Sequence, residues 1–360
     1  MILTIVVFLL IIGVLVVVHE FGHFIVAKKA GVKVEEFAVG FPPRIATFKR
    51  GETNYSINLI PLGGYVKMLG ELEHSADKRA FENQKPVKRF WISIAGVLMN
   101  LILAWFLLTI GFAVGMSPIV SSSSEIPGKT VSSEVIIADV TKDSAAAKAG
   151  MQPEDILISA SANNDVTTFS SPAEVTAYTK SHQGESVTLI YKRDGNTISH
   201  DTVLAKSDAP LGIAMVLKSI VKVAWYRAPY VALHETYEVV KLTFEFLGSF
   251  FAKLFTSGKV AEGVGGPVAI YAYTGLAVKA GFMVILQFVA LLSINLALLN
   301  ILPFPALDGG RLVFIVLERF FGKKVVRESV ENIIHTVGFA VLILLMIAIT
   351  YKDVIKLFHK

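Results

Sequence analysis

Residues 2–27 read ILTIVVFLLIIGVLVVVHEFGHFIVA, an apolar run that contains His19, Glu20 and His23 near its end. At 1.5 Å per residue, a helix of this length crosses the roughly 30 Å of hydrocarbon in a bilayer. A secretory signal would begin with a basic region and end at a cleavage site of small residues, and neither is visible here. We therefore predict a first transmembrane helix over 2–27 that is kept in the mature protein.

The composition of the whole chain supports the same class. The 360 residues are 53% hydrophobic and 18% charged, and the mean hydropathy is +0.60, whereas a soluble domain carries about 25% charged residues. Three further apolar runs are long enough to cross a bilayer, at about 90–115, 281–302 and 333–349. We therefore predict a polytopic α-helical membrane protein with four transmembrane helices.

The net charge and the absence of cysteine limit the partners and the metal ligands that this protein can have. The formal net charge is +5, but no compact basic patch with interleaved aromatic residues is visible, so we expect no nucleic-acid partner. The basic residues are better explained as loop residues that orient the chain in the lipid bilayer. Cysteine is absent, so no disulfide can form, and any metal must be held by His, Asp or Glu.

Lysine and arginine gather in two of the loops between the predicted helices, 28–89 and 303–332. Because loops of this kind stay in the cytoplasm, the N-terminus and residues 116–280 should lie outside. A further membrane span within 208–280 would invert everything downstream, so this segment is the weakest point of the predicted topology.

The external region divides into three parts, between membrane parts at 1–115 and 281–360. Residues 116–130 include the polar run SSSSEIPGK and predict a linker. Residues 208–280 include an amphipathic pattern at 234–247, which we expect to lie on the outer membrane surface. The middle part, 131–207, has the composition of a soluble α+β domain, with four strand patterns and one helix, at 135–140, 156–160, 187–193, 198–204 and 172–182.

Within this middle part, residues 143–157 read DSAAAKAGMQPEDIL and resemble a PDZ domain. A short helix would end at Gly150, and a Pro-x-Asp turn would lead into a strand. We therefore predict one inserted, extracytoplasmic PDZ-like domain. Its expected work is to bind a newly exposed C-terminal peptide or to exclude bulky substrates by size.

His19, Glu20 and His23 form the pattern His-Glu-x-x-His inside the first predicted helix. Positions i and i+4 share one helix face, so both imidazoles can bind one zinc ion while Glu20 acts on its water. An ionisable side chain inside a transmembrane helix costs at least about 2.5–3.5 kcal/mol and is functional by default. The alternative, in which His19 and Glu20 reach the membrane surface as structural residues, is the weaker interpretation.

A catalytic zinc needs a third protein ligand, and Asp308 in the run NILPFPALDGGR (300–311) is the best candidate. The first and third helices should run parallel, which brings His19 and Asp308 toward the same side of the membrane. Pro303 interrupts the helix, and the two glycines after Asp308 allow the chain to turn. An Asp before two glycines is by itself ordinary turn chemistry, but the matching depth favours a ligand.

These motifs resemble those of the bacterial site-2 proteases, the group that includes the regulator-of-sigma-E protease. The family pattern Asn-x-x-Pro-x-x-x-x-Asp-Gly matches at Asn300, Pro303, Asp308 and Gly309 with its spacing intact. The runs PLGGYVKM (61–68) and GVGGP (263–267) also resemble the family. The resemblance extends over essentially the whole chain, with one PDZ-like domain where some members have two.

This resemblance implies an intramembrane zinc metalloprotease of the bacterial inner membrane, with its active site toward the cytoplasm. Zinc would be bound by His19, His23 and Asp308, and Glu20 would be the general base. Substrates would be single-span membrane proteins, such as anti-sigma factors or signal-peptide remnants. Asn300 would contact the substrate together with Pro303, although an amide that only packs between helices explains the residue about equally well.

A transmembrane substrate must unwind before it is cut, and a strand pattern at 55–67 suggests how. Its apolar part, 57–62, is expected to pair with the unwound substrate by strand addition. Gly63 and Gly64 would permit close backbone approach. An ordinary cytoplasmic hairpin is the alternative.

Two other classes of function remain open. A catalytically inactive, membrane-anchored PDZ scaffold would not need Glu20 beside paired histidines. A metal transporter would place polar residues in several helices, and the second and fourth predicted helices carry almost none. The remaining histidines lack partner spacing and are interpreted as structural: His74, His182, His200, His234, His335 and His359.

Overall fold

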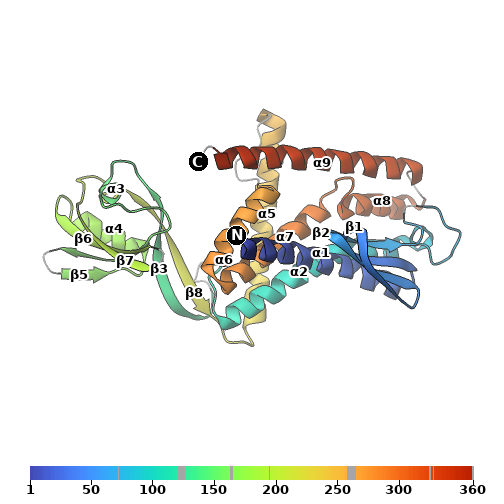
Figure 1. The fold of residues 1–360 in the computed structure, drawn as a ribbon, viewed down its shortest axis with the longest axis horizontal. Helices are drawn as coiled ribbons and strands as arrows, with labels where there is room; N and C mark the ends of the chain where they lie inside the picture. The colour runs from blue at the N-terminus through green and yellow to red at the C-terminus, as the bar shows by residue number, and fades with distance from the viewer. Residues whose placement is uncertain are drawn as a thin grey trace. The chain divides into compact units, whose positions relative to one another are not determined.

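The structure is a computed structural model that describes residues 1–71, 73–120, 126–162, 165–193, 195–257, 265–323, 326 and 328–358. Part of the predicted linker, part of the GVGGP run and His359 lie outside these residues. The chain divides into two compact units, one of Met1–Gly111 with Pro229–Lys360 and one of Phe112–Ala228. Figure 1 labels most of the helices and strands of both.

Four helices in the described part of the chain are long and apolar enough to cross a membrane. They match the four predicted spans, and the first and the last helix continue a few residues beyond their apolar runs. The first ends at Ala30 because Gly31 adopts a left-handed conformation, φ 84°, that closes the last turn. The four are α1 (Ile2–Ala30), α2 (Pro86–Val114), α7 (Phe282–Ile301) and α9 (Glu328–Phe358), in which the span is Ile333–Ile355.

Three more helices belong to the same unit. The amphipathic pattern predicted at 234–247 lies inside the much longer α5 (Ala228–Ser257), and its placement on the membrane surface stays a prediction. The other two are α6 (Pro267–Ala280) and α8 (Asp308–Phe321). Helix α8 begins at the candidate zinc ligand, so Asp308 lies in the first turn of a helix that the sequence did not predict.

The loop between α1 and α2 folds into a sheet made of two long strands, β1 (Val34–Arg50) and β2 (Thr53–Met68). Both strands bend, so the first half of β1 has neighbours on two sides. Val39, for example, lies opposite Ile57 on one side and Gly64 on the other. The order of segments across the sheet is therefore 44–50, 53–58, 34–39 and 64–68.

This order corrects one prediction from the sequence. Ile57 lies inside the sheet, opposite Ala46 on one side and Val39 on the other, and Ile60 lies opposite Phe41, so the run 57–62 is not a free edge. The open edges among the described residues are 44–50 and 64–68. A strand pattern shows that residues are extended, but it does not show which neighbours they acquire.

An apolar cluster joins this sheet to the helices around it. Helices α1, α2 and α8, the short helix η1 (Phe81–Asn83) and both strands contribute to it, so the sheet is fixed against α1 just where the His-Glu-x-x-His motif ends. Its buried members are Ala27, Val32, Val34, Val66, Met68, Phe81, Ile92 and Ile315.

The second unit contains the expected α+β domain. Its sheet has the order β7-β6-β4-β3-β8, and β5 pairs with β4. Helix α3 begins where the Ser144 hydroxyl accepts a hydrogen bond from the Ala147 amide, and the chain turns at Gly150, φ 70°. The elements are β3 (Lys129–Val140), α3 (Ala145–Lys148), β4 (Ile156–Ala162), β5 (Asp165–Thr168), α4 (Pro172–Ser181), β6 (Ser186–Arg193), β7 (Asn196–Val203) and β8 (Ile213–Lys222).

The domain is longer than the predicted 131–207. Strand β8 pairs with β3 from Lys129 opposite Lys222 to Val140 opposite Ile213, so the sheet extends beyond the predicted end. The predicted segment 208–280 is accordingly not one interfacial element, because it contains this strand as well as α5 and α6. In β8, only the last residues alternate between buried and partly exposed positions. The strand therefore lacks the regular alternation of apolar and polar residues from which a strand is predicted.

Asp155, the last residue of the Pro-x-Asp turn, stabilises this domain. Its carboxylate is 1% exposed and accepts two hydrogen bonds from Arg193, from Nε at 2.7 Å and from Nη2 at 2.6 Å. It also accepts the Gln152 amide at 2.8 Å. The turn and strand β6 are therefore joined through one buried carboxylate.

We predict that Asp155→Ala destabilises the domain by roughly 2–3 kcal/mol, because hydrogen bonds to a charged group are lost and donors are left without an acceptor. Faster hydrogen exchange in β4 and β6 of the full-length protein is the measurement. The matched control is Asp208→Ala, which removes an exposed carboxylate and should leave exchange unchanged. Equal exchange in both variants would contradict the assignment.

Candidate metal centre

Three potential ligands from two distant parts of the chain converge in the membrane unit. Nε2 of His19 and Nε2 of His23 lie 3.2 Å apart on successive turns of α1. Oδ2 of Asp308 lies 3.1 Å from the first and 3.3 Å from the second. Both imidazoles are buried, and the Asp308 side chain is 19% exposed. No other set of three such groups gathers among the described residues.

The spacing of these atoms fits a zinc ion. Ligands about 2.0–2.1 Å from a tetrahedral zinc are about 3.3 Å from one another, which matches the three measured distances. Oδ2 of Asp308 is buried and accepts no hydrogen bond from the described residues. Two imidazole nitrogens and one carboxylate oxygen that converge this closely can bind one cation, and this mixed donor set suits zinc.

Helix α2 orients both imidazole rings. Nδ1 of His23 donates a hydrogen bond to the Ile92 carbonyl at 2.7 Å, which leaves Nε2 unprotonated and available to a metal. Nδ1 of His19 lies 3.4 Å from the amide nitrogen, Nδ2, of Asn100. The two ends of an amide are alike in shape, and Oδ1 is the end that accepts the proton that Nδ1 carries when Nε2 binds zinc. With its amide in that orientation, Asn100 would hold His19 as Ile92 holds His23.

Two glycines allow α1 and α2 to approach closely at this point. A Cβ atom on Gly22 would overlap the Ala95 carbonyl oxygen. A Cβ atom on Gly96 would overlap Nε2 of His23 and would lie 2.6 Å from Cε1 of His19. The metal-binding edges of both rings therefore occupy the space beside Gly96.

Glu20 lies on the same cavity as the three ligands. This cavity has a volume of about 860 Å³, and Tyr65 and Val66 of β2 contribute to its wall. A Cβ atom on Gly64 would lie 3.5 Å from Cγ of Glu20, so the β2 backbone passes directly over the carboxylate side chain. Gly64 is therefore next to the site, whereas the neighbouring Gly63 is in contact with the Phe41 ring.

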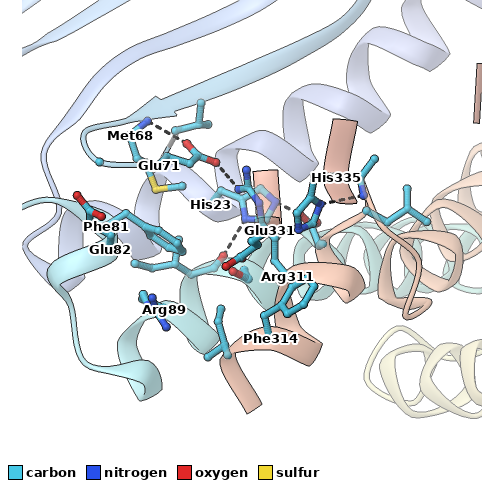
Figure 2. Close-up of a pocket in the computed structure, with 18 of the residues that line it drawn as sticks. His23, Met68, Glu71, Phe81, Glu82, Arg89, Arg311, Phe314, Glu331 and His335 are labelled. Atoms are coloured by element: carbon cyan, nitrogen blue, oxygen red, sulfur yellow. Dashed lines mark hydrogen bonds and ion pairs between the residues drawn. The ribbon is translucent and has the colours of Figure 1, made fainter. Parts of the chain in front are cut away.

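Figure 2 shows an ion pair between two residues that line this cavity, Glu71 and Arg311. The Glu71 carboxylate accepts hydrogen bonds from Arg311 and from the Met68 amide, the latter at 3.2 Å. Arg311 lies one helical turn after Asp308 in α8, so Glu71 joins the end of β2 to the helix that carries the third ligand. A second ion pair, between Arg89 and Glu318, joins α2 to α8.

The structure thus brings together the four residues with predicted chemical roles, His19, Glu20, His23 and Asp308. It does not bring Asn300 or Pro303 to the cavity wall: Asn300 lies in the last turn of α7, and Pro303 is exposed in the loop that follows. Four residues that help to build the site were missed by the sequence analysis: Glu71, Gly96, Asn100 and Arg311. Asn100 was detectable, because an amide inside a transmembrane helix needs a partner.

Comparisons with known proteins agree with this geometry. The family model described as peptidase family M50 matches residues 7–345. A relative from Clostridium acetobutylicum that is named as a zinc metalloprotease is 37% identical over 98% of this chain and 97% of its own. Zinc metalloprotease RasP of Shouchella clausii is 31% identical, and the regulator of sigma-W protease RasP of Bacillus subtilis is 28% identical, each over 99% of both chains.

Among solved structures, the PDZ domain of an SdrC-like protein from Listeria monocytogenes aligns with 23% of this chain and 86% of its own. The two are 26% identical, and the TM-score is 0.20, which is too low to assign a fold.

We predict that Gly96→Ala abolishes stoichiometric zinc binding, because the added methyl group occupies the space of the His19 and His23 rings. Zinc content per chain in the purified protein is the measurement. The matched control is Gly13→Ala in α1, where nothing lies within 4 Å of the added atom. Full zinc occupancy in Gly96→Ala would show that the two rings do not bind metal in this position.

Proposed function

The chain belongs to peptidase family M50 and is a zinc metalloprotease, and from this premise we propose that it hydrolyses peptide bonds inside or next to the transmembrane segments of membrane-anchored proteins. The observation that carries the proposal is the position of the ligands. His19 and His23 lie in α1, which is apolar enough to cross a bilayer, and Asp308 lies within 3.3 Å of both. Buried ionisable groups are costly in a transmembrane helix, so their presence there implies chemistry at that depth.

The chemistry follows from the residues around the metal site. His19, His23 and Asp308 would hold the zinc ion, which when bound would lower the pKa of water toward ~7 and polarise a carbonyl group. Glu20 lines the same cavity, and it is not one of the three ligands. It takes the proton from the attacking water and passes it to the nitrogen of the leaving amine.

The proposed orientation follows the distribution of positive charge. The loop between α1 and α2 and the segment between α7 and α9 are basic and should face the cytoplasm. The protein would then lie in the bacterial inner membrane with its α+β domain outside. Polar and charged side chains such as Glu71, Arg89 and Glu318 line the cavity, which gives water a path to the ligands.

We assign substrate binding to the edge of β2 formed by residues 64–68. The Met68 amide bonds to Glu71, whereas the Leu69 amide bonds to Lys33, so the two donors point to opposite sides of the strand. Successive amides of a strand point to alternate sides, so the Val66 amide, two residues before that of Met68, also points to the open side. An unwound substrate can add to this edge as a further strand, which satisfies backbone groups that are costly to expose in lipid.

The proposed substrates are proteins with a single membrane span. One relative is named as a regulator of sigma-W, which supports membrane-anchored anti-sigma factors as one substrate class, with signal-peptide remnants as another. The α+β domain would bind a newly exposed C-terminus or exclude bulky external domains. Since it would lie outside, it would contribute no catalytic group.

We predict that Glu20→Gln keeps one zinc per chain and loses at least about 100-fold in activity, because Gln retains the shape of Glu20 but accepts no proton. Zinc content and cleavage of a co-expressed single-span reporter are measured together, and mass spectrometry locates the cut. Asp308→Ala is the companion variant and should lose both zinc and activity. Cuts found only far from the membrane segment of the reporter would contradict the proposal.

A second prediction concerns the substrate edge. Val66→Pro removes the amide that faces the open side of β2, so cleavage should fall strongly while zinc content stays normal. The matched control is Ile45→Pro, in the other open edge and at an irregularity in the pairing, where proline is tolerated. Substrates with Gly or Pro near the cut should recover part of the loss, because they unwind more easily. Equal activity in both variants would remove the strand-addition step.

A further inference from the structure

Helix α9 supplies no zinc ligand, yet it contacts the loop that leads to Asp308. This loop, 302–307, contains Pro303 and Pro305, which have no amide hydrogen to donate. Its end is compact, because a Cβ atom on Gly310 would lie 3.0 Å from the Phe304 carbonyl carbon. The direction of the Asp308 carboxylate therefore depends on the contacts that hold this loop in place.

One of these contacts comes from His335 in α9. The Ala306 amide donates a hydrogen bond to Nδ1 of His335 at 2.9 Å (Figure 2). Ala306 has φ 76°, a conformation that residues other than glycine rarely adopt. Such a conformation persists only where surrounding contacts hold it, and this hydrogen bond is one of them.

The same imidazole also packs against the helix that begins with Asp308. The ring centroids of His335 and Phe314 are 5.9 Å apart and the planes are inclined at 61°, an edge-to-face contact. His335 therefore touches the chain on both sides of the ligand, at Ala306 before it and at Phe314 in α8 after it.

A glycine brings α9 close enough for these contacts. A Cβ atom on Gly338 would lie 2.7 Å from the Pro305 carbonyl oxygen, so the α9 backbone packs directly on the loop. Gly338 follows His335 by three residues and lies on the same helix face. Other α9 side chains, such as Glu331 and Phe339, also line the cavity, but His335 is the α9 residue that accepts the hydrogen bond from the loop before Asp308.

We infer that His335 is a positioning residue for the zinc ligand Asp308, acting through the hydrogen bond that Nδ1 accepts from the Ala306 amide. This inference rests on the proposed function in one respect, the role of Asp308 as a ligand. The acceptor must be Nδ1 without a proton, so the neutral ring carries its proton on Nε2. Residues that hold a metal ligand in place commonly contribute about 10–100-fold to metal affinity.

The test compares three substitutions at this position in the full-length protein. His335→Leu removes the acceptor. His335→Asn places an amide oxygen close to the position of Nδ1, whereas His335→Gln places it close to that of Nε2. Zinc release to a chelator is measured together with kcat and KM for a single-span reporter, and a thermal melt verifies that each variant is folded.

We expect about 10–100-fold weaker zinc binding and a lower kcat in His335→Leu, with KM unchanged. His335→Asn should be close to the wild type, and His335→Gln should resemble His335→Leu. The matched control is His234→Leu, which removes an exposed imidazole from α5 and should change nothing. Wild-type zinc affinity in His335→Leu, or a loss in His335→Asn equal to that in His335→Leu, would overturn the inference.

Asp308→Ala separates this inference from the proposed function. If Asp308→Ala keeps its zinc, the ligand assignment is wrong and the role of His335 falls with it. If Asp308→Ala loses its zinc while His335→Leu retains wild-type affinity, only the role of His335 is wrong.

Discussion

The convergence of His19, His23 and Asp308 is the constraint on which the rest of the membrane unit depends. Three buried metal-binding atoms lie within 3.1–3.3 Å of one another, and they come from helices near the two ends of the chain. Without a shared cation, a buried carboxylate beside two imidazoles would be costly in an apolar environment. The helices must therefore pack closely enough, and in the right register, to bring these atoms to one point.

The packing of α1 on α2 shows how that requirement is met. Gly22 and Gly96 remove the side-chain atoms that would keep the two backbones apart, and the space beside Gly96 receives the imidazole rings. Helices in lipid gain little from burying apolar surface against each other, so close contact between small residues and interhelical hydrogen bonds carry more of the association. The bond from His23 to the Ile92 carbonyl serves both purposes, because it joins the helices and orients a ligand.

The sheet and α8 extend the same arrangement toward a substrate. Glu71 connects the Met68 amide at the edge of β2 to Arg311, one turn after Asp308, so the proposed substrate edge and the third ligand are parts of one hydrogen-bonded assembly. Gly64 lets the β2 backbone pass over Glu20. A peptide added to this edge, as proposed, would lie beside the three ligands and Glu20, which line the same cavity as Tyr65 and Val66.

The sequence by itself determined the membrane class and the four candidate spans, and it singled out His19, Glu20 and His23 as the candidate site, because apolar length and i, i+4 spacing are local properties of a chain. Asp308 followed from matching depth and from the family pattern. Only the tertiary structure decided that 64–68, and not 57–62, is the open edge, that β8 belongs to the sheet of the α+β domain, and that Gly96, Asn100 and His335 lie next to the ligands or to the loop before Asp308. Each of these depends on a neighbour far away in the chain, and such neighbours are chosen by packing, which leaves no periodic signal in the sequence.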